Sequence, residues 1–175
     1  KISALDQSPI RKGGTAADAV RETIELAKVC ERLGYSRYWL AEHHNTTSFA
    51  GSTPEVLIAR VAAETSRIRV GSGGIMLPHY SPLKVAENFR MLETMYPGRV
   101  DLAIGRAPGS DGRTAVALQA GPQAWDVGVF PQQAELLRHY LEESAGIAAW
   151  PDDHPYRQIH ASPRGPGIMR ATLMA

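Results

Sequence analysis

The sequence predicts an α/β protein in which a parallel sheet is covered by helices. Apolar, strand-like runs begin near Ile2, Ser36, Ile68 and Val100, so successive starts lie 34, 32 and 32 residues apart. A strand followed by a crossover helix occupies about thirty residues. Strands that alternate with helices at this spacing favour a parallel sheet, whose functional groups gather at the carboxyl ends of its strands.

The segments between the strand-like runs carry helix signals. Apolar and small residues recur at three- and four-residue spacing from Ala16 to Leu33, and Gly34 follows where a helix would end. Thr53-Pro54 and Ser81-Pro82 each place a hydroxyl residue before a proline, which predicts a hydroxyl N-cap followed by the first helical position. A further helix is expected from Gln132 to Glu143.

Composition is that of an ordinary globular protein and nominates no partner. Of 175 residues, 43% are hydrophobic, and 19 Lys and Arg against 18 Asp and Glu give a net charge of +1. No basic run indicates binding to nucleic acid or to an anionic membrane. No apolar run approaches the roughly eighteen residues of a membrane span, and the start lacks a signal-peptide core, so we expect a cytoplasmic protein. The single cysteine, Cys30, is expected to be a buried hydrophobe on the first helix.

The second strand runs into titratable residues. Its sequence is Tyr38-Trp39-Leu40-Ala41-Glu42-His43-His44-Asn45. An α/β barrel presents catalytic side chains at its mouth in this way, although histidines at a strand end also serve to cap backbone groups. Side chains alternate between faces in an extended segment, so only one of His43 and His44 faces the mouth. Glu42 and His44 share one face, where one can orient the other.

The third and fourth strands lead into glycine-rich segments. The run 68–78 contains Gly73 and Gly74 near the carboxyl end of the strand, where the backbone can form a bulge or let a flat ligand approach. The fourth strand passes into a Gly/Pro loop with Arg106 and Arg113, whose planar guanidinium groups suit anionic oxygens, although a solvated loop is the alternative. The P-loop pattern is absent, and no Gly-x-Gly-x-x-Gly follows the first strand.

Taken in order, several motifs resemble those of the bacterial luciferase-like flavin-dependent monooxygenases. They are Asp6-Gln7-Ser8-Pro9, the Trp-Leu-x-Glu-His-His strand end, the run 70–78 and the run 98–106. The resemblance covers about the first 145 residues. It implies a TIM-barrel type of fold, a (β/α)8 barrel that binds reduced FMN, or in some branches a deazaflavin, at its carboxyl face. It also implies that dioxygen and a small organic substrate are the reactants.

The resemblance assigns roles to four residues and no metal ligand. His43 corresponds to the catalytic histidine of the family, and Arg106 to an arginine near the flavin phosphate. Gly73 and Gly74 correspond to a non-prolyl cis peptide that lies against the flavin ring. We expect the strand itself to accommodate Gly74→Val, and the new side chain to obstruct the flavin plane.

The length departs from that of the family. A complete eightfold barrel needs about 250 residues, and this chain has about four βα units. We therefore expect residues 1–145 to form the N-terminal half of a barrel, from a truncated or frame-altered gene. Residues 146–175 are expected to form a connecting segment and an atypical tail without an apolar fifth strand. Because an open four-stranded sheet leaves edge strands and an inner face uncovered, a homodimer or higher oligomer is also expected.

Three functions stay open from the sequence. The first is a flavin-dependent monooxygenase, or one half of it. The second is a non-catalytic flavin-binding or vestigial half barrel, which the short length supports. The third is a metal-dependent barrel hydrolase, which is disfavoured because adjacent histidines chelate poorly from a strand and no His-x-His spacing occurs here. The sequence does not name the substrate or distinguish FMN from a deazaflavin.

Overall fold

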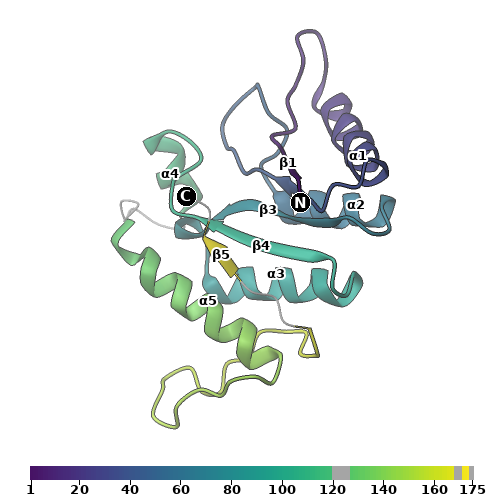
Figure 1. Ribbon diagram of the computed structural model, residues 1–175. Helices are drawn as coiled ribbons and strands as arrows, with labels where there is room; N and C mark the ends of the chain where they lie inside the picture. The colour runs from purple at the N-terminus through teal and green to yellow at the C-terminus, as the bar shows by residue number, and fades with distance from the viewer. Residues whose placement is uncertain (120–126, 168–170, 174–175) are drawn as a thin grey trace.

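The centre of the molecule is a parallel sheet of five strands in the order β1-β2-β3-β4-β5 (Figure 1). The computed structural model describes residues 1–119, 127–167 and 171–173. Each strand lies beside the one that precedes it in the chain, which is the winding of a barrel; a doubly wound sheet reverses its order instead. The strands are β1 (Ser3–Asp6), β2 (Arg37–Leu40), β3 (Arg69–Met76), β4 (Val100–Gly105) and β5 (Ala171–Leu173).

The helices lie between the strands in the chain, and all but the one at Gly112–Leu118 begin close to where the sequence predicts them. They are α1 (Ala16–Arg32), α2 (Pro54–Glu64), α3 (Pro82–Met95), α4 (Gly112–Leu118) and α5 (Phe130–Ser144), with 3₁₀ turns η1 (Leu77–His79) and η2 (Val127–Val129). Gly34 follows α1 at a φ of 77°, as expected of a helix end. Thr53 and Ser81 are the N-cap residues of α2 and α3 and a proline follows each of them, as predicted, but their side chains make no capping hydrogen bond. A hydroxyl cap occurs instead at Thr15, which forms a capping box with Asp18.

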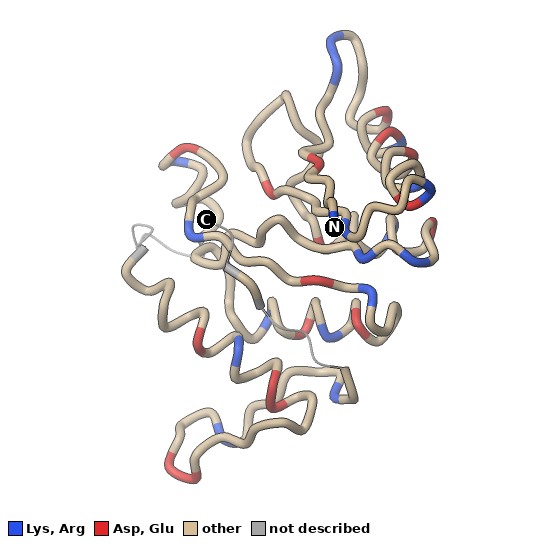
Figure 2. The backbone as a smooth tube through the Cα atoms, viewed as in Figure 1, with Lys and Arg blue, Asp and Glu red and all other residues tan. Residues whose placement is uncertain are grey.

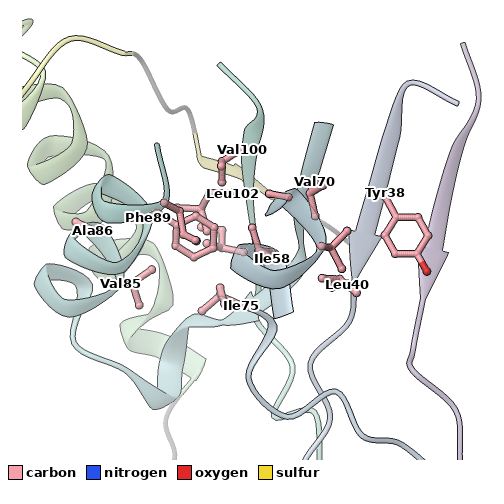
Figure 3. Close-up of a cluster of buried hydrophobic side chains, with 14 of the residues drawn as sticks. Tyr38, Leu40, Ile58, Val70, Ile75, Val85, Ala86, Phe89, Val100 and Leu102 are labelled. Atoms are coloured by element: carbon pink, nitrogen blue, oxygen red, sulfur yellow. The ribbon is translucent and has the colours of Figure 1, made fainter. Parts of the chain in front are cut away.

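The core lies between the sheet and the helices. Along β2 the side chains alternate, so that Tyr38 and Leu40 are fully buried on the helix side. Figure 3 shows Val85 and Phe89 of α3 turned toward the sheet, and Cys30 of α1 belongs to the same buried cluster, as predicted. The helices therefore cover one face of the sheet. The opposite face is the one that a barrel turns inward.

That inner face carries charge near the start of the strands. Arg69 and Arg37, on adjacent strands, both bond to Asp101 of β4, at 2.7 Å and 3.1 Å. Above them Trp39 lies over Gly71, where an added Cβ would come within 2.8 Å of the indole ring. A glycine is therefore required at this position.

Charges of both signs are spread over the helices and loops (Figure 2). This distribution agrees with the net charge of +1. Within the described ranges no helix combines the length and the apolar character that crossing a membrane requires.

The chain ends in a short fifth strand, so the expectation of a tail without one is wrong. β5 pairs in parallel with β4, with Leu102 opposite Ala171 and Ile104 opposite Leu173. The segment before β5 has no apolar run, and it is held by its backbone instead. The buried guanidinium of Arg90 on α3 donates to three carbonyl oxygens, those of Pro163 (3.2 Å), Gly165 (2.6 Å) and Gly167 (2.8 Å). Local sequence patterns do not report such a long-range contact.

We predict that Arg90→Lys lowers the free energy of unfolding by about 2 to 3 kcal/mol, because one ammonium cannot reach three separate carbonyls. Amide hydrogen exchange over residues 163–167 should accelerate as well. Arg60→Lys is the matched control, since Arg60 is exposed and pairs with Glu64 on the same helix; its effect should stay within about 0.5 kcal/mol. Similar losses in the two variants would contradict the anchoring role of Arg90.

Glu31 fastens the end of α1 to the start of β3. One of its carboxylate oxygens accepts the backbone N–H groups of Ser66, Arg67 and Ile68 at 2.9, 2.6 and 2.9 Å. Burial opposes ionisation of this group, but the three N–H donors outweigh it and lower the pKa of Glu31 to about 2. The ionised carboxylate therefore contributes to stability at neutral pH.

We predict that Glu31→Gln lowers the free energy of unfolding by about 1 to 2 kcal/mol at pH 7, measured by urea denaturation. The folded-state pKa lies below the unfolded one, so the contribution is complete above about pH 4.5 and is lost as the pH falls toward 2. The difference in the free energy of unfolding between the wild type and the Glu31→Gln protein should therefore narrow over that pH range. Glu25→Gln, at an exposed site on the same helix, should show neither the loss nor the narrowing.

Candidate active site

The loops that follow β2, β3 and β4 meet at one edge of the sheet because parallel strands end on the same side. Hydrogen bonds tie these loops together. The backbone N–H of His44 donates to Gly109 O at 3.1 Å, and Nε2 of His79 donates to Pro108 O at 2.8 Å. The side-chain amide of Asn45 donates to the hydroxyl of Thr114 at 2.9 Å. The three loops form one connected surface.

Glu42 lies at the centre of these contacts with its side chain fully buried. Its Oε1 is 2.7 Å from Nε2 of His44 and accepts the hydroxyl proton of Tyr80, also at 2.7 Å. Its Oε2 accepts the backbone N–H of Met76 at 3.0 Å. The prediction that Glu42 and His44 share a face is confirmed. The carboxylate links the end of β2 to the end of β3.

Two neighbours of Glu42 have shifted pKa values. Burial, and then the negative charge of Glu42, raise the pKa of Tyr80, so its hydroxyl stays protonated and continues to donate. Burial also raises the pKa of Glu55 at the start of α2. Tyr80 and Glu55 both line a cavity of about 220 Å³ between α2 and α3, with Ile75 and Phe89 among its apolar walls.

Among the described residues, no carboxylate pairs with His43. Its backbone N–H donates to Gly51 O at 2.9 Å, and its ring lies 4.9 Å from that of Phe49. The Nδ1 atom is buried and has no hydrogen-bond partner within the described ranges. A buried polar atom of this kind is costly unless a ligand or water satisfies it. That His43 faces the mouth remains a prediction.

The peptide bond between Gly73 and Gly74 is cis, as predicted. The pairing of β3 with β4 shifts register between Ser72 and Ile75, so the bulge expected of a glycine-interrupted strand is present as well. A Cβ on Gly74 would lie 2.8 Å from the carbonyl oxygen of Ala103. The expectation that the strand accommodates Gly74→Val is therefore wrong, because β4 occupies the space that the side chain needs.

Arg106 follows β4 directly and is exposed. No ion pair involves it among the described residues, and none of its contacts join it to Glu42 or His43. The structure thus brings His43, the two glycines and Arg106 to the same edge of the sheet without linking their side chains.

Sequence reasoning missed the partners that organise this edge. Tyr80 lies 38 residues beyond Glu42 in the chain, and its local sequence does not indicate that the two side chains are in contact. Asp111 could have been predicted as an N-cap, because aspartate is preferred at that position. Its side chain accepts the N–H groups of Arg113 and Thr114 at the start of α4. Asn45 adopts the left-handed αL conformation, with a φ of 50°. Asparagine tolerates this conformation, so its sequence position is also consistent with a turn.

Comparison with known proteins decides the family. Residues 2–144 match the luciferase-like monooxygenases. The chain belongs to this family. It is 45% identical over 171 residues to the N-acetyl-S-alkylcysteine monooxygenase of Bacillus subtilis (strain 168), covering 96% of this chain and 49% of the relative. It is 50% identical over 137 residues to a luciferase-like monooxygenase of Escherichia coli (strain K12), covering 78% of this chain and 41% of the relative.

Solved structures of the family share the fold. The crystal structure of apo-MsnO8 superposes with a TM-score of 0.87 at 44% identity, covering all of this chain and 49% of that one. A 3,6-diketocamphane monooxygenase from Pseudomonas putida in complex with FMN gives 0.73 at 17% identity, covering 99% and 51%, and shows the fold alone. This chain spans about half the length of the curated relatives that it matches.

We predict that Gly74→Ala lowers the free energy of unfolding by about 1 to 3 kcal/mol, because the methyl group forces β3 and β4 apart. The measurement is thermal or urea unfolding. Gly112→Ala provides the control, since a Cβ there meets nothing within 4 Å and its φ is compatible with alanine. A Gly74→Ala protein as stable as Gly112→Ala would disprove the close approach of the two strands.

Proposed function

We propose that the chain supplies the flavin-binding part of a monooxygenase site, which uses reduced FMN or a deazaflavin with dioxygen on a small organic substrate. The observation that carries this proposal is the arrangement of β2, β3 and β4. These adjacent strands bring His43, Gly73-Gly74 and Arg106 to one edge of the sheet in a chain of the luciferase-like family. The FMN complex of a protein with the same fold supports a flavin of this kind.

The residues present fit a flavin. The buried Nδ1 of His43 lacks a hydrogen-bond partner among the described residues, and a bound ligand would satisfy it. The glycine pair 73–74 places no side chain between the end of β3 and a flat ring system. Arg106 offers an exposed guanidinium for a phosphate group. An F420-dependent secondary alcohol dehydrogenase shares the fold at 16% identity and a TM-score of 0.70, covering 99% of this chain and 51% of that one, which keeps a deazaflavin as the alternative.

Each residue has a distinct task in this proposal. When bound, a reduced flavin supplies electrons to dioxygen. His43 exchanges protons at its Nδ1, because an imidazole can act both as a general acid and as a general base. Arg106 binds the phosphate, and Gly73 and Gly74 allow the ring to approach the backbone. The core and the helices exclude water from the sheet side of the site.

We propose the same two parts of the chain that the sequence predicts. Residues 1–145 form the part of the barrel that carries the site. Residues 146–175 form the connecting segment, which Arg90 anchors before β5 begins. We propose that the protein acts in the cytoplasm.

We predict that FMN binds to the purified chain, detected by a change in its visible absorption and by quenching of its fluorescence. His43→Ala should lower oxygen-dependent turnover of reduced FMN by about 100-fold or more, and His44→Ala by less. His154→Ala is the matched control, because His154 stacks on Trp150, away from this edge of the sheet. Equal losses at His43 and His44 would refute the assignment of His43, and binding without turnover would favour a flavin-binding protein that is not an enzyme.

We also propose that the chain forms a homodimer or higher oligomer. β1 has a neighbouring strand on one side only, and Leu5 on its inner face is 57% exposed. Edge strands with exposed apolar side chains pair with further chains. Light scattering should show an assembly at micromolar concentration, and Leu5→Lys should weaken it. Leu26→Lys, at an exposed position on α1, should leave it intact; a monomer whose thermal unfolding is independent of concentration would overturn this proposal.

A further inference from the structure

We propose that Glu42 is a positioning residue that holds His44 as its Nε2–H tautomer, so that Nδ1 of His44 is left as a proton acceptor next to the site, on the face opposite to the one predicted for His43. This inference rests on the proposed function for the use of the proton. The position of the ring rests on the contacts around Glu42 alone.

Glu42 itself is fixed from two directions. The Tyr80 hydroxyl donates to Oε1 and the Met76 backbone N–H donates to Oε2. Both donors come from the end of β3 and the turn that follows it, and burial keeps the Tyr80 hydroxyl protonated. With its side chain fully buried, Glu42 has no alternative position that retains these bonds.

The tautomer of His44 follows from the donors and acceptors around Glu42. A carboxylate accepts hydrogen bonds and has no proton to give. Since both Glu42 oxygens already accept, the 2.7 Å contact to His44 requires the proton to lie on Nε2. The Tyr80 oxygen is also 3.4 Å from Nε2, but its single proton is used on Glu42 at 2.7 Å. Nδ1 of the neutral ring is left with its lone pair.

The backbone fixes the same ring from its other end. The N–H of His44 donates to Gly109 O in the loop after β4, and the next residue, Asn45, is bonded to Asp111 and Thr114. The other histidines at this edge differ. His79 uses Nε2 on the carbonyl of Pro108, and no carboxylate bonds to His43 among the described residues. His44 is oriented by a buried carboxylate.

A carboxylate in this position does two things for an imidazole. It fixes which nitrogen is free, and it stabilises the imidazolium that forms when that nitrogen accepts a proton. A proton that moves to Nδ1 leaves its donor one unit more negative and gives His44 a positive charge. The Nε2–H bond stays intact throughout, and the reverse transfer from Nδ1 restores the neutral ring. Glu42 therefore acts through His44 and need not touch a ligand.

The test is ¹⁵N NMR of the full chain labelled at histidine, at a pH where His44 is neutral and without any flavin. His44→Gln identifies the His44 signals by their loss. We expect the wild type to show Nε2 protonated and Nδ1 unprotonated. Glu42→Gln should shift both resonances toward a mixture of tautomers, because the amide can donate to Nε2 as well as accept from it. Glu55→Gln is the matched control, since it makes the same change at a neighbouring carboxyl that acts on His44 only through its charge and not through a hydrogen bond, and it should leave the tautomer of His44 unchanged.

Two results would overturn the proposal: an Nδ1–H tautomer in the wild type, or an unchanged His44 spectrum in a folded Glu42→Gln protein. The first decides the matter even where Glu42→Gln does not fold. FMN titrations of the same proteins separate this proposal from the proposed function. Because Glu42 is buried, Glu42→Gln should keep the Kd for FMN within about threefold and lower turnover by roughly tenfold. Absence of FMN binding in the wild type would count against the proposed function, while the tautomer still decides the role of Glu42.

Discussion

Parallel pairing in chain order is the constraint on which the rest of this molecule depends. Because each strand lies beside its predecessor and runs in the same direction, every loop that follows a strand emerges at one edge of the sheet. Alternation within each strand then separates the tasks of the two faces: Tyr38 and Leu40 pack under the helices, while Arg37 and Trp39 face inward. The site needs no long-range folding event of its own, since residues up to 69 positions apart meet wherever the sheet forms.

Within that frame, ionic groups with several fixed partners set the details. Glu42 connects two strand ends, Glu31 connects a helix to a strand, and Arg90 holds the segment before the last strand. Glu31 and Arg90 are satisfied by backbone groups, and Glu42 by one backbone N–H together with the side chains of Tyr80 and His44. Burying a charge is costly unless its partners are fixed in place, so these contacts are all-or-none. These contacts limit the conformations that the loops can adopt more than they increase the net free energy of unfolding.

The sequence predicts the parts of this structure that depend on periodicity and on residues with narrow conformational preferences. The strand starts, the prolines that open α2 and α3, Gly34 after α1 and the glycine pair in β3 all fall where the pattern places them. The contact between Glu42 and His44 can also be predicted, because side chains alternate between faces in an extended segment and these two residues are two positions apart. Tyr80 and β5 are not, since each depends on a partner dozens of residues away and on no local preference. The obstruction beside Gly74 likewise depends on how closely β4 approaches, a distance that no composition encodes.

The anchoring by Arg90 has a consequence for how this protein tolerates change. The guanidinium binds carbonyl oxygens, which every amino acid possesses, and it makes no demand on the side chains of residues 163–167. The path of that segment is thus encoded in α3. An exposed position such as Pro166 can therefore change while the backbone keeps its course, but Gly167 cannot, because its φ is 111° and an added Cβ would lie 2.9 Å from Oε1 of Glu93. The path of the segment thus depends on Arg90 and on Gly167 more than on the identity of the exposed side chains between them.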